Sequence, residues 1–303
     1  MNGSAPQVSV VMPVFNAQRY LAEAVESILA QTWRDFEFVI VDDGSTDRSP
    51  KLLERYAVRD SRIKLIRRPN TGIVGALNDG IAAASGELIA RMDADDVALP
   101  QRLEKQVAYL AQHPEVVALG SRVTGVDPYG CVLFHSEHKL AHEEIDAELL
   151  RGVGWAIVHP AAMLRRAAVA AIGGYRPQFQ WVEDLDLFLR LGETGKLANL
   201  PEALLRYRQH TESINRTRSA EQARLADACV REAYRRRGGE PPPGWKFVPK
   251  AKPARDVQLR TWAWMAMKDG NVPVARKHAV ELWKTAPLSV ESWRTLLCAM
   301  RGH

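Results

Sequence analysis

The chain has 303 residues, 46% hydrophobic and 25% charged, enough for one large domain with an extension or for two domains. Its net charge of +5 is uneven: residues 216–303 hold 18 Lys and Arg against 8 Asp and Glu, whereas the first 215 residues are slightly acidic. Three widely spaced cysteines argue against a disulfide framework or zinc site, no run approaches the roughly 20 apolar residues of a membrane span, and residues 1–7 lack a signal-peptide pattern.

Strands and helices alternate over the first 115 residues. Apolar runs predict strands at 8–14, 36–41, 63–66 and 88–92. Apolar residues at helical spacing predict helices at 20–29, 49–56, 73–84 and 100–113, with Ser49 as an N-cap before Pro50. This alternation indicates a parallel sheet with helices on both faces, in which ligands bind at the carboxyl ends of the strands.

Polar residues follow three of these strands, at 13–16, 42–45 and 93–96. The last group places Asp93, Asp95 and Asp96 directly after an apolar run. Mutual repulsion makes such a cluster costly in a buried strand. Its hard oxygen ligands suit a divalent cation such as Mg or Mn. The alternative is a solvated acidic turn that also begins the next helix, a role that we favour slightly for Asp96.

The second part of the chain is less regular. The sequence predicts a strand at 116–126, a returning strand at 131–134, a helix at 143–150, a short apolar segment at 159–164 and a strand at 204–208. Gly173–Tyr175 interrupts the chain, and Glu183 and Asp184 lead into a helix. His159 precedes Pro160, and we interpret it as structural.

A helical, basic segment ends the chain. Helices are predicted from about 217 to 237 and at 256–268, 272–285 and 289–300, separated by a Gly- and Pro-rich linker at about 238–254. We therefore expect one domain at 1–215, with halves at 1–115 and 116–215, and a helical extension at 216–303. The tryptophans of the extension fit a helical core or a membrane surface. No nucleic-acid-binding module is present in the sequence, so we expect no nucleic-acid partner.

Several motifs occur in an order that resembles family 2 glycosyltransferases of the GT-A fold. The resemblance covers about Val8 to Ser213 and implies an α/β fold: a Rossmann-like, mostly parallel sheet flanked by helices, here with a C-terminal helical extension. The motifs are Val11–Asn16, Val41–Asp47, Asn70–Gly72, Gly86–Ile89, Met92–Asp96, Gly173–Tyr175 and Glu183–Asp184.

The resemblance implies a nucleotide-sugar donor and assigns residues to it. Pro13, Phe15 and Asn16 match the segment that lines the base pocket. Asp43 matches the acid that hydrogen-bonds the base, typically uracil. A carboxylate can accept a hydrogen bond from the ring N–H of a base such as uracil, and so can select the type of pyrimidine that is bound. Without the family motifs, Asp42–Ser45 also fits an ordinary turn.

The resemblance also implies a metal site of Mn or Mg. Asp93 and Asp95 match the acid-x-acid (DXD) motif, in which Asp95 is a metal ligand and Asp93 holds the ribose or shares the metal. His210 resembles a position that completes the metal shell or contacts the diphosphate in some relatives, although a surface histidine fits equally. A divalent ion stabilises the charge that a diphosphate gains as it leaves.

Asp184 matches the family's catalytic base, with Glu183 as the second candidate. An inverting single displacement needs such a base to take the acceptor proton. Asp184 also fits a helix cap. One position departs from the family pattern, since Ala76 is followed by Leu77 rather than by an arginine. We expect the missing cation to be replaced by Arg91, Arg206 or Arg208.

Together these features predict an inverting, metal-dependent transfer from a UDP-sugar or similar donor to an acceptor hydroxyl, in polysaccharide or glycoconjugate synthesis. The expected partners are the donor and a saccharide or lipid-linked acceptor. We expect a cytoplasmic chain whose C-terminal helices contact the inner face of the membrane or mediate a homodimer. Two alternatives remain: a nucleotidyltransferase of similar fold, and a catalytically silent sugar-nucleotide-binding scaffold.

Overall fold

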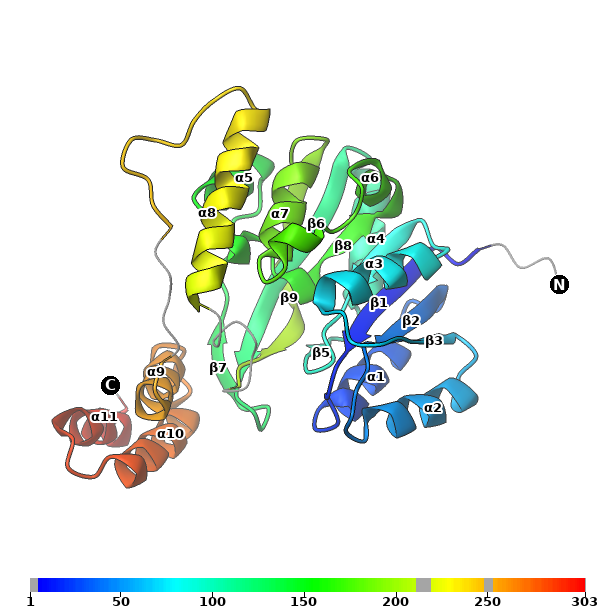
Figure 1. The fold of residues 1–303 in the computed structure, drawn as a ribbon. Coiled ribbons are helices and arrows are strands. Elements are labelled where there is room, and N and C mark those ends of the chain that lie inside the picture. Colours follow the sequence, from blue (N-terminus) through cyan, green and yellow to red (C-terminus); the bar gives the residue numbers. More distant parts are fainter. Residues whose placement is uncertain (1–4, 211–218, 248–252, 303) are drawn as a thin grey trace.

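A mixed β-sheet with helices on both faces forms the centre of this computed structural model (Figure 1). The structure describes residues 5–210, 219–247 and 253–302. The strand order is β3-β2-β1-β4-β8-β6-β9-β5, and β7 pairs with β6. The strands are β1 (Val8–Val14), β2 (Phe36–Asp42), β3 (Ile63–Arg67), β4 (Leu88–Arg91), β5 (Val97–Ala98), β6 (Val116–Val126), β7 (Val132–His135), β8 (Met163–Arg165) and β9 (Lys196–Arg208).

Helices surround this sheet and continue beyond it. The α-helices are α1 (Leu21–Leu29), α2 (Ser49–Arg59), α3 (Ile73–Ala83), α4 (Arg102–Gln112), α5 (His142–Leu150), α6 (Arg166–Ala171), α7 (Glu183–Leu191), α8 (Ser219–Arg236), α9 (Arg255–Lys268), α10 (Val272–Thr285) and α11 (Val290–Arg301). Short 3-10 turns lie at η1 (Gly154–Ala156), η2 (His159–Ala161) and η3 (Pro177–Phe179).

The first half of the sheet is parallel, as the alternation of strands and helices predicts. β1 pairs in parallel with both β2 and β4, and β3 pairs in parallel with β2. Successive side chains of a strand point to opposite faces. Val10 and Met12 therefore enter the core that α1, α2 and α4 cover, whereas Val11 enters the core on the other face. The carboxyl ends of β1, β2 and β4 consequently meet at one edge.

The second half of the sheet is mixed. β8 is antiparallel to both β4 and β6, and β6 is parallel to β9. The expected α/β fold is confirmed, but parallel pairing is confined to fewer strand pairs than the sequence predicts. β9 begins at Lys196, well before the predicted strand at 204–208, because Asn199, Pro201 and Glu202 hide the apolar pattern.

One predicted helix cap is wrong. Ser49 is the first residue of α2, and its hydroxyl accepts a hydrogen bond from the Ala17 amide at 3.0 Å instead of bonding its own helix. The N-cap position is taken by Arg48, and the Asp47 carboxylate just before it accepts from the Ser49 amide at 2.8 Å. The serine hydroxyl is used to tie the loop before α1 to the start of α2.

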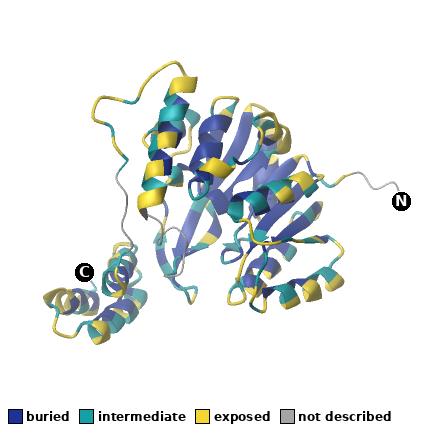
Figure 2. Cartoon of the chain, in the orientation of Figure 1, coloured by how far each residue is buried: buried dark blue, intermediate teal, exposed yellow. Residues whose placement is uncertain are grey.

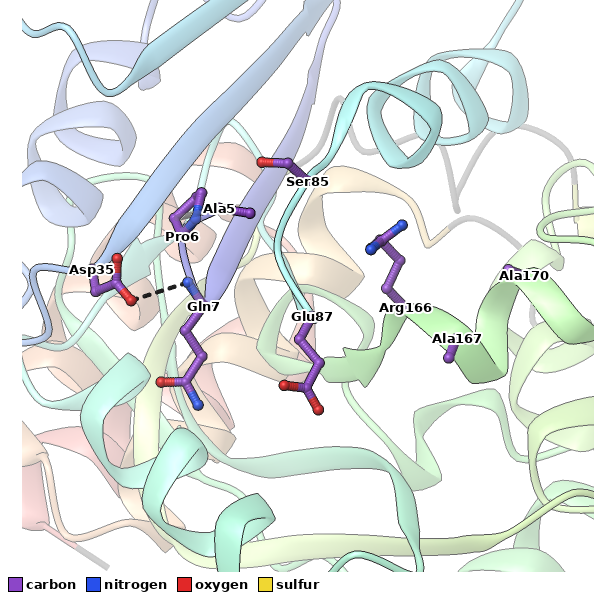
Figure 3. A pocket seen from close by; sticks show the side chains of 9 residues that line it. All are labelled: Ala5, Pro6, Gln7, Asp35, Ser85, Glu87, Arg166, Ala167 and Ala170. Carbon is purple, nitrogen blue, oxygen red and sulfur yellow. Dashed lines mark hydrogen bonds between the residues drawn. The ribbon is translucent and has the colours of Figure 1, made fainter. Parts of the chain in front are cut away.

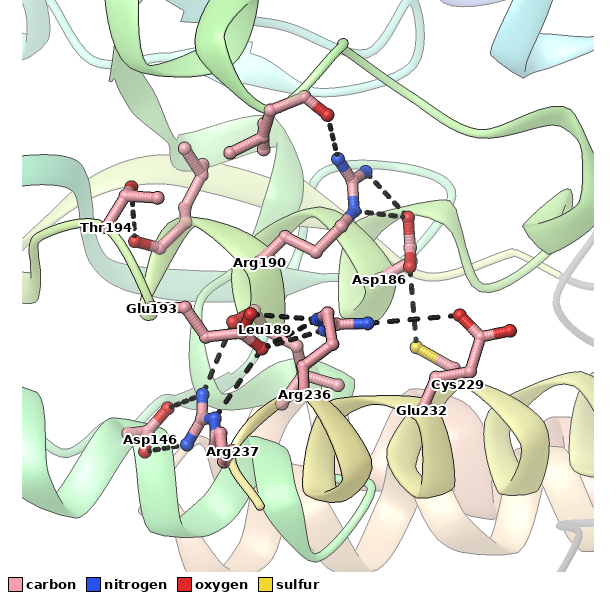
Figure 4. Close-up of polar contacts among 12 residues, drawn as sticks. Asp146, Asp186, Leu189, Arg190, Glu193, Thr194, Cys229, Glu232, Arg236 and Arg237 are labelled. Atoms are coloured by element: carbon pink, nitrogen blue, oxygen red, sulfur yellow. Dashed lines mark hydrogen bonds and ion pairs between the residues drawn. The ribbon is translucent and has the colours of Figure 1, made fainter.

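Helix α8 packs against the sheet-bearing part of the chain. Leu225, Cys229 and Val230 belong to the same core as α7. Polar contacts also join α8 and the residue after it to α5, α7 and the residues beside them (Figure 4). On the α8 side they involve Cys229, Glu232, Arg236 and Arg237, and on the other side Asp146, Arg176, Asp186 and Glu193. The predicted boundary after residue 215 lies outside the described residues. Because of this packing, we propose that the first domain extends through α8.

Helices α9–α11 form a separate helical unit with its own apolar core, which includes Trp262 and the β7 residue Leu133. The buried Asp127, at the turn between β6 and β7, lies 2.6 Å from Lys277 Nζ and 3.0 Å from His278 Nε2 of α10. Asn271 also donates to the Val132 carbonyl at 2.9 Å. The unit is therefore held on the β6–β7 hairpin. Within the described ranges, no helix combines the length and apolar character that crossing a membrane requires.

Candidate active site

Asp43 follows β2 and joins two strand-end loops. Its buried carboxylate accepts hydrogen bonds from the amides of Thr71 at 3.1 Å and Gly72 at 2.9 Å. Carboxylate oxygens have further lone pairs, so Asp43 still has capacity to accept from a ligand. Gly44 has φ +76°, and a Cβ there would lie 2.7 Å from the Asn70 amide nitrogen. The close approach of the two loops therefore requires glycine at this position.

Arg68 is a cation beside Asp43 that sequence reasoning missed. Its Nε lies 3.2 Å from Asp43 Oδ1, its Nη1 lies 2.5 Å from Asp79 Oδ2, and Nη2 donates to the Thr71 hydroxyl. Its side chain is 16% exposed, so the guanidinium is largely buried beside Asp43. The available signal was the basic pair Arg67 and Arg68 at the end of β3, next to the strand that carries Asp43.

Asn16 links the loop after β1 to the loop after β2. It has a left-handed φ of +50°, its side-chain oxygen accepts from the Thr46 amide at 2.8 Å, and its own amide donates to the Ser45 hydroxyl at 3.0 Å. The neighbouring Phe15 is 49% exposed, so its ring is accessible to a ligand. Pro13 stays within β1. The three predicted base-pocket residues thus lie at the end of β1 and on the loop after it, with different degrees of access.

The three acids after β4 form one cluster. Asp93, Asp95 and Asp96 each offer a carboxylate oxygen, and these oxygens lie within 4.8 Å of one another. Burial raises the pKa of Asp93, although the ion pair with Arg91 opposes this. Burial and the two neighbouring acids raise the pKa of Asp96 well above its usual range. Such a set of crowded oxygens fits a hard divalent cation, which would offset their repulsion.

Asp96 is buried in the loop directly before β5 rather than placed at a helix start. The next residues form β5, and α4 begins only at Arg102, so the expected N-terminal helix role is wrong. Asp96 Oδ1 accepts from the Arg208 amide at 2.8 Å, and among the described residues Oδ2 has no hydrogen-bond partner. The antiparallel pairing of β5 with β9 places Asp96 beside Arg208.

Arg208 holds the acid cluster and does not provide the free cation that we expected for a diphosphate. Its side chain is 3% exposed and lies 2.6 Å from Glu23. It donates to the Asp95 carbonyl at 2.8 Å and stacks on Tyr20, 4.6 Å from the ring centroid. Because this guanidinium is buried and already paired, Arg208 is a poor replacement for the missing arginine after Ala76.

His210 reaches the same cluster from the end of β9. Its Nε2 lies 2.7 Å from Asp95 Oδ2, and its ring centroid lies 5.6 Å from that of Tyr20. The structure thus brings His210 beside a predicted metal ligand. Its role as a ligand itself, or as a contact to the diphosphate, remains a prediction.

Glu183 and Asp184 form the first turn of α7. Burial, reinforced by the charge of Asp184, raises the pKa of Glu183 to about 8, and burial also raises the pKa of Asp184. A raised pKa makes an ionised carboxylate a stronger proton acceptor, whereas a pKa of about 8 leaves Glu183 mostly protonated at neutral pH. Trp181, just before them, has a φ of +81°, which is strained for a bulky residue. The turn into α7 is therefore fixed by its surroundings.

Arg91 connects the strand-end acids with those of α7. It is 4% exposed, and its Nη1 lies 2.6 Å from Asp93 Oδ2. Its charge also acts to lower the pKa values of Glu183 and Asp184, against the stronger effect of their burial. The predicted base and the predicted metal ligands therefore share one buried cation.

A further loop motif is held against α3. The Asn78 amide group donates to the Tyr175 carbonyl at 2.8 Å and accepts from the Tyr175 amide at 3.0 Å. The Tyr175 hydroxyl lies 2.7 Å from Nε2 of the buried His159. These contacts are consistent with the structural role expected for His159.

A cavity of about 460 Å³ lies away from these residues, beside the amino ends of β1 and β4 (Figure 3). Its lining includes Gln7, Asp35, Glu87 and Arg166, and the Gln7 amide donates to Asp35 at 3.1 Å. Ligands of α/β sheets bind at the opposite, carboxyl ends of the strands. We therefore place the candidate site at the acids and not at this cavity.

Comparisons of sequence agree with this placement. Residues 9–173 match the family described as glycosyl transferase family 2. EpsE of Bacillus subtilis is 36% identical over 218 residues, which cover 70% of this chain and 77% of EpsE. The O-antigen biosynthesis glycosyltransferase WbnJ of Escherichia coli is 34% identical over 215 residues, which cover 69% and 82% of the two chains.

Comparisons of structure show the same fold at low sequence identity. TarS 1–349 of S. aureus, in complex with UDP-GlcNAc, aligns with a TM-score of 0.58 at 17% identity, covering 98% of this chain and 92% of that one. In a longer TarS structure the match spans 53% of the chain. The mannosyltransferase PcManGT of Pyrobaculum calidifontis, in complex with GDP-Man and Mn2+, gives a TM-score of 0.58 at 18% identity, covering 98% and 80%. The chain belongs to glycosyltransferase family 2 and has the GT-A fold.

Proposed function

We propose that the protein is an inverting, Mn- or Mg-dependent glycosyltransferase that moves a sugar from a UDP-sugar to an acceptor hydroxyl in polysaccharide or glycoconjugate synthesis. The UDP-GlcNAc complex of TarS supports the donor class, and the Mn2+ complex of the mannosyltransferase supports the cation. The names of WbnJ and of the amylovoran biosynthesis glycosyltransferase AmsE of Erwinia amylovora support the setting.

One observation carries the proposal. Three acidic groups that are distant in sequence surround the same edge of the sheet: Asp43 after β2, the Asp93–Asp96 cluster after β4, and Asp184 at the start of α7. The charge of Asp93 contributes to raising the pKa of Asp184, so the latter two lie within electrostatic range. A base pocket, a diphosphate clamp and a proton acceptor are what this transfer needs.

The residues divide the reaction between them. Asp43 accepts from the pyrimidine ring, and Phe15 and Asn16 flank the base. Asp184 takes the proton of the acceptor hydroxyl as its oxygen bonds to the anomeric carbon. The bond from that carbon to the diphosphate breaks, and UDP leaves with the electron pair. A cation held by Asp93 and Asp95, with His210 close by, would offset the charge gained by the diphosphate.

The family match weighs against a nucleotidyltransferase. A silent scaffold would have no need for a buried acid pair with raised pKa values beside the acid cluster. Arg68, rather than an arginine after Ala76, is the cation that we propose for the donor pocket, because it lies next to Asp43.

The test is a screen of nucleotide-sugars with and without Mn, read first by thermal shift and then by UDP release. We expect a UDP-sugar to raise the melting temperature only when the cation is present. At about 100 times its dissociation constant, the bound donor should add a few kcal/mol to the free energy of unfolding. Asp95→Asn should abolish the cation-dependent shift, and Glu87→Gln, an exposed acid at the other edge, should not. Absence of both a shift and UDP release with every UDP-sugar would contradict the proposal, and NMR of the product's anomeric configuration tests inversion.

A further inference from the structure

Helix α11 exposes most of its large apolar side chains, although Leu296 packs against the core of the unit and the Trp293 ring contacts the edge of Trp283. Ser292, Thr295 and Ala299 face inward and are at most 1% exposed. Amphipathic helices ordinarily bury the large apolar residues instead. The exposed apolar residues, which we term the apolar stripe, are Leu288 in the turn before α11 and Val290, Trp293, Leu297 and Met300 of the helix, with exposures of 97, 79, 46, 52 and 56%.

The stripe is continuous along one side of the helix. Residues 290, 293, 297 and 300 follow one another at intervals of three and four, which places them on one face. Arg294, whose side chain is 67% exposed, and Arg301 lie at the same spacing within that face. Figure 2 shows α11 coloured mainly as exposed and intermediate. The face therefore combines apolar and cationic groups.

The way the unit is anchored leaves this face uncovered. The described contacts to the hairpin come from α9 and α10, through residues such as Asn271 and Lys277. Helix α11 packs on α10 and α9 and lies at the outer side of the unit (Figure 1). The apolar stripe thus lies on the layer farthest from the anchoring contacts.

We infer that the apolar stripe docks the protein on an anionic lipid surface. Residues 253–302 hold eight Lys and Arg against four Asp and Glu, so the unit is cationic. Apolar side chains entering the interface and cations meeting anionic headgroups are the two components of such binding. The Trp293 indole N–H already donates to the Pro287 carbonyl at 2.9 Å, so its ring can enter an apolar layer without leaving a donor unpaired.

A second copy of the chain fits this face less well. A two-fold contact would set the same stripe on both partners and would bring Arg294 and Arg301 close to their own copies. The nearby acid Glu291 is already shared, at 3.4 Å from Arg260 and 3.8 Å from Arg294. Anionic headgroups carry the opposite charge to these arginines, whereas a second copy of the chain would bring the same positive charges to the contact.

Docking also bears on the active site, and this step rests on the proposed function. Asp127 pairs with Lys277 of the unit, and the adjacent Pro128 carbonyl accepts from Arg208 at 3.4 Å. Arg208 in turn holds Asp95 and Asp96. A docked unit would therefore tether the acid cluster to the membrane through the β6–β7 hairpin, which suits an acceptor carried on a lipid.

The test is flotation of the full chain with phosphatidylcholine vesicles, either pure or containing about one quarter phosphatidylglycerol. We expect binding to the anionic vesicles at low salt, little binding to the neutral ones, and loss at high salt. Val290→Glu with Leu297→Glu should lower the bound fraction about tenfold or more, because two inserted side chains become charged. Arg294→Gln with Arg301→Gln should lower it on anionic vesicles only.

Val58→Glu is the matched control, since Val58 of α2 is 89% exposed and lies outside the stripe. It should bind as the wild type does, and equal melting temperatures should show that all variants fold. Failure of the wild type to float, or unchanged flotation of the Val290/Leu297 variant, would overturn the inference. A dimer in sedimentation that this variant dissociates would assign the stripe to a second copy instead. No sugar substrate enters the assay, so its result is independent of the proposed transfer reaction.

Discussion

Nε2 of His210 lies 2.7 Å from Oδ2 of Asp95, across 115 positions of sequence. The contact joins the end of β9 to the loop after β4, and the pairing of β5 with β9 makes it possible. Imidazole beside a carboxylate is a common arrangement around metal ions, where it orients the ligand. The relationship makes His210 part of the acid cluster, whichever of the two roles it has.

Replacement of His210 by alanine should weaken cation-dependent donor binding by roughly ten- to hundredfold, as loss of a ligand or of its orienting partner does. A titration of Mn at fixed UDP-sugar, followed by thermal shift, measures this. His113→Ala is the control, because that histidine lies at the C-terminal end of α4 and is 40% exposed. An unchanged Mn midpoint in the His210 variant would show that the histidine is only a surface neighbour.

Asp184→Asn should reduce transfer to the acceptor by about 10²- to 10⁴-fold, the usual contribution of a general base. Donor binding should stay near the wild-type level, because Asp184 is assigned to the acceptor side. Rates under saturating donor, combined with donor affinity, separate the two effects. Glu183→Gln is the comparison: if it loses more activity than Asp184→Asn, the base assignment moves to Glu183.

The raised pKa of Glu183 predicts a pH-dependent stability. Its pKa is about 8 in the folded chain against an ordinary value of 4.5, so the folded state holds the proton more tightly than the unfolded state between these values. The resulting stabilisation is complete below about pH 4.5 and is lost as the pH rises toward 8, with a slope of at most about 1.4 kcal/mol per pH unit. Urea unfolding across this range should show a shallower slope in Glu183→Gln. Identical slopes in both proteins would contradict a buried, protonated Glu183.

Asp127→Ala should loosen the C-terminal unit. The carboxylate is fully buried, but Lys277 is 35% exposed and can be solvated when its partner is removed, so we expect a cost of about 1–3 kcal/mol. Limited proteolysis between α8 and α9, together with the free energy of unfolding, measures the change. Glu137→Gln is the control, since that side chain is 82% exposed. Equal protease resistance in the Asp127 variant would show that the apolar contacts alone hold the unit.

The sequence determines much of this protein by local pattern. The apolar runs of β1, β2 and β4 and the helices between them follow from residue spacing, because side-chain periodicity reports which face is buried. The order of the strand-end motifs also identified the family, which the comparisons confirm. Even the three C-terminal helices were predicted to within a few residues.

Only the tertiary structure decides how distant residues meet. The antiparallel β8, the two-residue β5 and the early start of β9 carry weak local signals, yet they bring Arg208 and His210 to the acids. Arg68 gains its place beside Asp43 from the pairing of β3 with β2. The outward apolar face of α11 likewise depends on which side of the helix packs on α9 and α10. Periodicity reveals that a helix is amphipathic, but the free energy of packing against specific neighbours decides which face is buried.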